Sequence, residues 1–304
     1  MKTIIAKILC YTAWPALLAF GLVLSGIGMV LGKPLLFFNI AYFTVITAIL
    51  LLERFMPFEY QWQEHDHETP AHLLHTLSSK GTVQGLLLFG GIIGLTELIT
   101  PVSVPSASIW PREWPMFLQV ILGLISAEFM LYWAHRLAHE HDLIWRFHAV
   151  HHSVKKLWVI NTGRFHFLES TFKIVFALSL LVVLGAPFEV VQWISVFTAF
   201  IGLLTHCNID VKTGFLSYIF NTPNLHRWHH SMDLREGNKN YGENLVLWDM
   251  LFGTYFNEHW RRPPAEIGIH DYMPPRFLDQ ILYPFRRAHY QEMGGDPARK
   301  ESSL

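Results

Sequence analysis

Eight histidines of this 304-residue chain fall into three short clusters whose spacing is typical of a metal centre. The clusters are His135-x3-His139, His148-x2-His151-His152 and His226-x2-His229-His230. Neutral imidazole binds a metal through one ring nitrogen while a neighbouring group holds the other. A tetrahedral site needs only four ligands, so eight imidazoles indicate two metal ions held side by side. Because each cluster adjoins a long apolar run, the pattern predicts redox chemistry on a lipid at the rim of a membrane.

Helical spacing predicts how the members of each cluster meet. Residues four apart lie on one face of a helix, so His135 and His139 are expected to project together. In the other two clusters the second and third histidines follow the first by three and four residues, and all three are expected to converge from one turn. These identical arrangements predict a pseudo-symmetric pair of ligand sets.

Three further side chains are candidates for the same site. His206 ends the last apolar run and is expected as an additional ligand. His166 opens the run before it and is expected either to bind metal or to pair with Glu169. Glu128 lies seven residues before His135, on the same face and two turns deeper in the membrane. Because a buried acid needs a partner, Glu128 is expected either to support a metal ligand from behind or to pair with an arginine or water.

The remaining histidines and the two cysteines narrow the chemistry. Cys10 and Cys207 lie in apolar stretches, which excludes a thiolate site. Imidazole suits zinc, copper, iron and nickel alike, and the H-E-x-x-H pattern of a zinc protease helix is absent from the sequence. The number of histidines favours iron, whose redox cycle can split dioxygen, although spacing alone leaves the metal open. A solvated surface cluster is expected in the acidic loop that holds His65, His67, His72 and His75.

The chain that must position these histidines is 51% hydrophobic and 15% charged, against about 25% charged residues in average soluble domains. Its net charge of -1 excludes a basic surface for nucleic acid. A spanning helix needs about 20 apolar residues. Such runs are predicted at 8–31, 35–52, 82–98 and 115–138, with shorter runs at 170–184 and 188–205. The turn signal Gly185-Ala186-Pro187 joins the last two into a helical hairpin, which either spans or re-enters the membrane.

Positive charge predicts the orientation of these helices, because Lys and Arg are enriched in short cytoplasmic loops. One set of ends carries most of it, namely Lys2, Lys7, Arg54, Lys80, Arg136, Arg146, Lys155, Lys156 and Arg164. All three histidine clusters then lie on the cytoplasmic side. From Asn221 on, the chain is polar, aromatic and rich in proline, which predicts a cytosolic cap of short helices.

The expected fold is therefore an all-α integral membrane protein with about four transmembrane helices, a helical hairpin and a cytosolic helical cap that holds a di-metal site. We predict a single membrane-embedded domain over 1–304. Within it, 1–114 supply membrane helices without catalytic motifs, 115–260 form the catalytic region and 261–304 form a cytosolic tail. The first apolar run lacks an A-x-A-like exit and is expected to remain as an uncleaved helix.

Together the motifs resemble those of the fatty acid hydroxylase and sterol desaturase superfamily of integral-membrane di-iron enzymes. The resemblance covers about residues 120–258 and rests on Tyr132-Trp133-Ala134-His135-Arg136-x2-His139, Phe147-His148-x2-His151-His152-Ser153, Arg164-x-His166-x2-Glu169, His206-x-Asn208, His226-Arg227-Trp228-His229-His230, Asn240-Tyr241-Gly242-Glu243-Asn244 and Trp248-Asp249-x2-Phe252-Gly253-Thr254. It implies that the eight cluster histidines ligate two iron ions, with His166 and His206 as candidate ninth and tenth members.

The resemblance also implies supporting roles for residues behind the ligands. Glu128 stands where the family usually has an aspartate, and Glu169 belongs to a matching motif. Asn240 and Asp249 are expected to hold the second ring nitrogens of ligand histidines. Plain core packing is the alternative for the segment that follows Asp249.

The activity implied by the resemblance is an oxygen-dependent reaction at an unactivated C–H bond of a membrane lipid. Abstraction of one hydrogen followed by rebound gives an alcohol, and a second abstraction gives an alkene. A hydroxylase is thus the leading interpretation and a desaturase the alternative. Electrons are expected from a separate ferredoxin, cytochrome or reductase, or from a reduced pterin, since the sequence contains no G-x-G-x-x-G fingerprint. The substrate stays open among sterols, fatty acyl chains, sphingoid bases, ether lipids and aminolipids.

An interpretation of a different class is a membrane metal-binding or transport protein. Transport sites lie near the membrane midplane, whereas these clusters fall at helix ends, which disfavours transport. The compact chain is more typical of the bacterial inner membrane, with an active site facing the cytoplasm.

Overall fold

A computed structural model of the protein describes residues 4–92, 109–258 and 260–294. Helices are the only regular secondary structure in these ranges. Across these ranges, extended structure is limited to isolated bridges. Five helices are long and apolar enough to cross a membrane: α1 (Ile4–Val30), α2 (Pro34–Phe55), α5 (Met116–Glu140), α7 (Phe167–Leu184) and α8 (Phe188–Thr205). The predicted all-α membrane architecture and its hairpin are confirmed.

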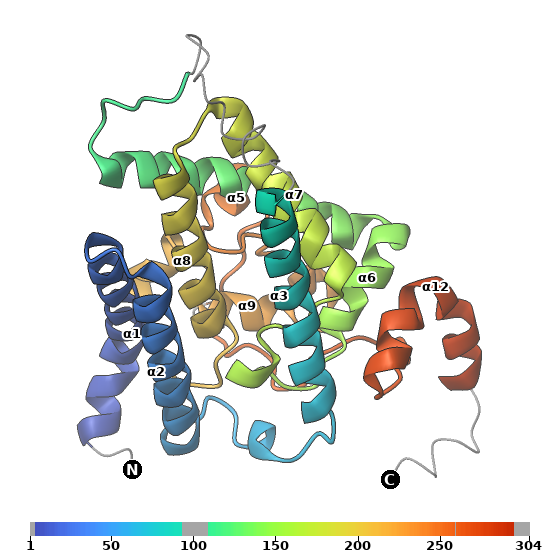
Figure 1. The fold of residues 1–304 in the computed structure, drawn as a ribbon. Helices are drawn as coiled ribbons and strands as arrows, with labels where there is room; N and C mark the ends of the chain where they lie inside the picture. Colours follow the sequence, from blue (N-terminus) through green and yellow to red (C-terminus); the bar gives the residue numbers. More distant parts are fainter. Residues whose placement is uncertain (1–3, 93–108, 259, 295–304) are drawn as a thin grey trace.

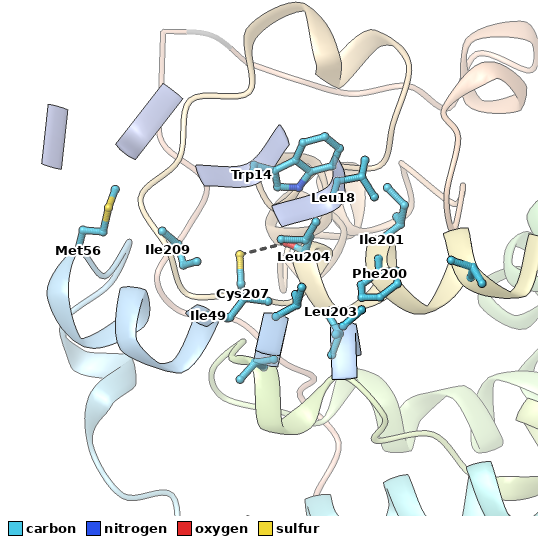
Figure 2. Close-up of a cluster of buried hydrophobic side chains, with 14 of the residues drawn as sticks. Trp14, Leu18, Ile49, Met56, Phe200, Ile201, Leu203, Leu204, Cys207 and Ile209 are labelled. Atoms are coloured by element: carbon cyan, nitrogen blue, oxygen red, sulfur yellow. Dashed lines mark hydrogen bonds between the residues drawn. The ribbon is translucent and has the colours of Figure 1, made fainter. Parts of the chain in front are cut away.

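The helices α1, α2 and α8 pack together on one side of the molecule (Figure 1). Figure 2 shows their shared core, in which Trp14, Ile49 and Phe200 are at most 2% exposed. Gly21 permits the close approach of α1 to α8, because a Cβ there would lie 2.6 Å from the Phe200 ring. The outward faces keep large apolar side chains such as Phe43 exposed, as expected for helices that meet lipid rather than water.

The hairpin of α7 and α8 turns at Gly185, whose φ of 76° lies in the left-handed region that favours glycine at the end of a helix. α5 packs against both arms of the hairpin, and Leu124 and Val190 are buried between them. α5 carries its two cluster histidines in its last turns, and α8 ends immediately before His206. This packing therefore delivers three histidines to one end of the bundle.

The helix α3 (Thr69–Ile92) corrects the start of the membrane helix predicted at 82–98. It begins at Thr69 rather than Thr82, because Pro70 suits the first turn of a helix, where its missing N–H is not needed. The first half of α3 is polar on one side, so a search for uniformly apolar runs overlooked it. Residues 93–98 of the predicted span lie outside the described residues.

The polar part of the chain forms short elements around the histidines: η1 (Gln61–Gln63), α6 (Asp142–His152), η2 (Val159–Asn161), η3 (Gly214–Tyr218), α9 (Pro223–His229), α10 (Leu234–Gly237) and α11 (Leu247–Leu251). The last helix, α12 (Phe277–Gly294), is kinked at Arg286 and packs against α6 and α3. It lies at one edge of the molecule, away from α1 and α2 (Figure 1).

The predicted solvated cluster of loop histidines is wrong for His72 and His75, which are 1% and 0% exposed. The two ring nitrogens of His72 contact Arg164 at 3.0 Å and Asp66 at 3.1 Å. His75 lies between the carbonyl oxygen of Phe165 and the side chain of Gln280. The loop and the start of α3 fold inward because these polar groups supply one another's hydrogen-bond partners.

Candidate metal centre

Nine histidines assemble into two adjacent groups within the described residues. The five-histidine group consists of His135, His139, His148, His152 and His229. The four-histidine group consists of His151, His206, His226 and His230. In each group the candidate ligand nitrogens lie within 4.8 Å of one another. The fold thus brings together all eight cluster histidines and His206.

The two groups differ from the predicted pair of matching sets, because each triple cluster divides between them. On α6, His148 and His152 join the five-histidine group while His151 points to the other group. On α9, His229 joins the five-histidine group, while His226 and the following His230 join the four-histidine group. Adjacent helical residues diverge by about 100°, whereas residues four apart diverge by only about 40°. One turn of each helix therefore faces both groups.

The spacing of the Nε2 atoms suits metal coordination. His135 Nε2 lies 3.0 Å from His148 Nε2 in the five-histidine group. His226 Nε2 lies 3.0 Å from His206 Nε2 in the four-histidine group. A histidine nitrogen binds a metal at about 2.0–2.1 Å, so two such ligands at right angles are about 3 Å apart. The observed separations are those of neighbouring ligands on one ion.

The hydrogen bonds of the Nδ1 atoms show that some of these Nε2 contacts need a cation between them. His135 Nδ1 donates to the carbonyl oxygen of Tyr241 at 2.7 Å, and His148 Nδ1 donates to Glu169 Oε1 at 2.6 Å. A neutral imidazole that donates from Nδ1 keeps a bare lone pair on Nε2. Two such lone pairs face each other 3.0 Å apart, and neither nitrogen can donate to the other. His151 and His206 repeat the arrangement, with Nδ1 atoms bonded to carbonyl oxygens and Nε2 atoms 3.5 Å apart.

Burial keeps the histidines outside the membrane helices in the neutral form that metal binding requires. Removal from water lowers the pKa of His206 to about 4 and that of His229 to about 3. The same cause lowers the pKa well below its ordinary value in His148, His151, His152, His226 and His230. At neutral pH these rings are lone-pair donors rather than cations.

A buried charge network lies behind the five-histidine group. Glu169 accepts from His148 and also pairs with Lys173 Nζ at 3.0 Å. Lys173 pairs in turn with Glu243 at 2.7 Å, and Glu243 lies 3.8 Å from His135 Nδ1. The structure therefore places Glu169 behind a candidate ligand, as predicted. It also connects two candidate ligands through one lysine, which the prediction missed.

Glu128 acts on the backbone rather than on a histidine. It accepts hydrogen bonds from the backbone N–H groups of Glu243 and Asn244 and from the Asn244 side chain. These bonds hold the loop whose Tyr241 carbonyl oxygen accepts a hydrogen bond from His135 Nδ1. The described partners of Glu128 are thus backbone and amide groups in place of the histidine or the arginine that was predicted.

The supporting roles predicted for Asn240 and Asp249 are corrected in the same way. Asp249 accepts from the backbone of Tyr241 and Gly242, and Asn240 exchanges hydrogen bonds with the backbone of Phe256. Neither side chain is bonded to a histidine. Gly242 is required here because a Cβ would lie 2.2 Å from the carbonyl oxygen of Leu245. Backbone carbonyls of the loop, positioned by these side chains, contact the histidines instead.

His166 does not reach either histidine group. Its Nδ1 accepts from the backbone N–H of Leu168 at the start of α7, and its Nε2 donates to the carbonyl oxygen of Ile281 in α12. Both ring nitrogens are therefore engaged by backbone. Its pairing with Glu169 is also replaced, since the Glu169 carboxylate is bonded to His148 and Lys173.

Two residues of the site escaped sequence reasoning. Asn238 Oδ1 accepts from His139 Nδ1 at 3.1 Å, and nothing in its sequence context marks it. Lys173 is different, because a lysine inside an apolar run is a charged group at membrane depth. The same signal that drew attention to Glu128 would have found it.

A cavity of about 340 Å³ opens onto the five-histidine group. Its lining includes His139, His152 and His229 together with Trp145 and Arg287. The four-histidine group contributes no residue to this lining and is buried throughout. The two groups therefore differ in access as well as in ligand number.

Comparison with known proteins agrees with this geometry. The fatty acid hydroxylase family model matches residues 120–254, which contain every histidine of both groups. An ornithine lipid hydroxylase of Rhizobium tropici is 50% identical over 286 residues, covering 93% of this chain and 86% of that protein. The human alkylglycerol monooxygenase is 30% identical over 150 residues, covering 49% of this chain and 32% of that protein. No solved structure matches the chain.

Proposed function

Because the chain belongs to the fatty acid hydroxylase family and is a lipid hydroxylase, we propose that it uses two iron ions and dioxygen to hydroxylate a C–H bond of a membrane aminolipid. The similarity to an ornithine lipid hydroxylase over 93% of the chain supports an aminolipid rather than a sterol or a free fatty acid. The partial similarity to alkylglycerol monooxygenases supports lipid hydroxylation in general.

The observation that carries the metal assignment is the pair of facing lone pairs on His135 and His148. A cation between them turns a repulsive contact into two coordinate bonds. The four-histidine group provides a second set of neutral nitrogen donors at coordination distances. Nitrogen donors alone suit iron, copper or zinc; the oxygen chemistry of the family favours iron.

Two bound irons would supply the reductive activation of dioxygen and the cleavage of the C–H bond. The side chains of the protein hold and orient the site. The carbonyl oxygens of Tyr241, Lys239 and Arg164 fix protons on Nδ1 atoms, so that the Nε2 atoms face the ions. The Glu169–Lys173 pair keeps a carboxylate behind His148. Burial of the group excludes bulk water from all but the cavity side.

The cellular setting is part of the proposal. We assign the chain to a bacterial inner membrane, with the histidines at the cytoplasmic end of the bundle, as the loop charges predict. Electrons would come from a separate ferredoxin, cytochrome or reductase, or from a reduced pterin. Metal transport is disfavoured, because the histidines gather at the ends of α5 and α8 and on α6 and α9 rather than along a path through the bundle.

The test is comparative lipidomics of bacterial cells that produce aminolipids, with and without the chain. We expect an aminolipid that gains the mass of one oxygen atom, and no such product from His148→Ala. The matched control is His141→Ala, because His141 is exposed and lies outside both groups. Loss of two hydrogens instead would make the protein a desaturase. Unchanged aminolipids beside an oxidised lipid of another class would overturn the substrate assignment.

A further inference from the structure

The last described helix, α12, has an apolar face that the other described elements leave largely exposed, apart from the contact of Phe285 with Phe147 of α6. Leu278, Leu282 and Phe285 are spaced as i, i+4 and i+7, so they share one face of the helix. They are 71%, 37% and 65% exposed. On the opposite face, Gln280 and Tyr283 are fully buried against the rest of the protein. We propose that α12 lies on the surface of the membrane, with this apolar face inserted among anionic lipids.

The shape of α12 suits a helix that lies in the membrane surface rather than one that spans it. Only its outer face is apolar, and its inner face carries tyrosines and a glutamine. A strongly one-sided helix of low overall hydrophobicity is typical of an interfacial element. Pro284 and the non-helical backbone of Arg286 bend the helix beside Phe285. Phe285 therefore lies at the bend.

The helix α12 is linked through α3 to the candidate membrane helix α7. α12 packs against α3, and α3 packs against the membrane helix α7. Near these contacts α3 exposes Leu74 and Leu77, and α7 exposes Phe172. Exposed apolar side chains thus occur on α12, on the helix α3 that it contacts, and on α7, which α3 contacts in turn. Such an extended surface would be unstable in water, whereas a bilayer that surrounds α7 can cover it.

The charges beside this face indicate which lipids it meets. Arg276 stands just before the helix and Arg286 directly follows Phe285, and both side chains are exposed. Arg287, in contrast, is bound to Asp142 and Asp271 and is not available to lipid. Basic residues at the edge of an inserted apolar face attract the anionic lipids of the cytoplasmic leaflet. This charge pattern favours a lipid surface over a second copy of the chain.

Docking of α12 would bear on the cavity over the five-histidine group. The carbonyl oxygen of Ile281 in α12 accepts a hydrogen bond from His166 Nε2, and Gln280 contacts His75. Arg287 lines the cavity over the five-histidine group. The membrane surface would therefore hold one wall of that cavity in place, next to the leaflet that contains the lipid substrate.

The experiment is spin-label accessibility in proteoliposomes of phosphatidylcholine with phosphatidylglycerol. Single cysteines replace Leu282 or Phe285, and metal content equal to that of the unmodified protein reports correct folding. Val183→Cys is the lipid-facing control, because Val183 is 79% exposed on α7. Arg235→Cys is the aqueous control, because its side chain is 90% exposed on the short helix α10. The native cysteines are buried.

We expect labels at 282 and 285 to resemble the label at 183, with high access to oxygen and low access to a water-soluble nickel chelate. Access to nickel equal to that at 235 would overturn membrane docking. Exclusion of both reagents would overturn it as well, since it would mean that protein covers the face. In vesicles with anionic lipid, Arg276→Gln combined with Arg286→Gln should raise nickel access at 285. No change on that substitution would overturn the anionic-lipid part of the proposal.

Discussion

Replacement of Glu169 by Gln tests how the buried network tunes the metal centre. In the structure, His148 Nδ1 donates to Glu169 Oε1 at 2.6 Å, and both side chains are at most 4% exposed. Gln keeps the size of the side chain and an oxygen acceptor but removes the negative charge. Loss of a carboxylate behind a ligand histidine lowers metal affinity about 10–100-fold, which corresponds to about 1.4–2.7 kcal/mol.

The structure predicts that this loss is confined to one ion. In the four-histidine group, the Nδ1 partners of His151 and His206 are the backbone carbonyls of Arg164 and Gly202, which the substitution leaves in place. A chelator competition on the purified protein should therefore resolve one weakened and one unchanged binding step. Glu189→Gln, an exposed acid in the first turn of α8, is the matched control. Equal weakening of both steps, or no weakening of either, would refute the reasoning.

Three other predictions follow from the same contacts. His206→Asn should lower the metal content by one ion, because His206 belongs to the four-histidine group. His166→Asn should leave the metal content unchanged, because both ring nitrogens of His166 are bonded to backbone groups. Equal metal content in the two variants would contradict these assignments. Lys173→Met should lower the free energy of unfolding by about 3–5 kcal/mol, because it removes the only lysine that pairs with the buried carboxylate of Glu169 and the partly buried carboxylate of Glu243 among the described residues. Denaturant unfolding measures the loss, and a variant of unchanged stability would show that the lysine is dispensable. The metal-free protein should lose stability as the pH falls from about 6.5 towards 4, because the unfolded chain then binds protons that the folded chain does not. Burial lowers the pKa of His206 to about 4 in the folded state, and this residue alone lowers the free energy of unfolding by about 2 kcal/mol at pH 5. A free energy of unfolding that stays constant over this pH range would falsify the prediction.

Sequence reasoning predicted the histidines well because their chemistry is local. Spacing within one helical turn fixes which rings can meet, and so the eight cluster members could be named in advance. His206 could be named because it ends an apolar run at the same end of the bundle. The division of the clusters between two groups was missed, although the divergence of His151 and His152 by one helical step could have shown it. A match to a motif also does not fix a contact, as His166 demonstrates.

What the sequence could not provide was the position of the backbone. The Nδ1–H groups of His135 and His229 donate hydrogen bonds to the carbonyl oxygens of Tyr241 and Lys239. Every residue carries such a carbonyl, so no side-chain pattern identifies those that point at a histidine. For the same reason Glu128 and Asp249 were recognised as important but given the wrong partners, since each is bonded to backbone that lies far away in sequence or turns sharply.

The division of each triple cluster between two groups has a consequence for how the protein is made. The five-histidine group joins α5, α6 and α9, and the four-histidine group joins α6, α8 and α9. Neither set is complete until the ribosome has passed His229 or His230, after every membrane helix has been synthesised. Metal insertion must then be a late event in biogenesis. The ions would act as cross-links between helices that are already inserted in the membrane.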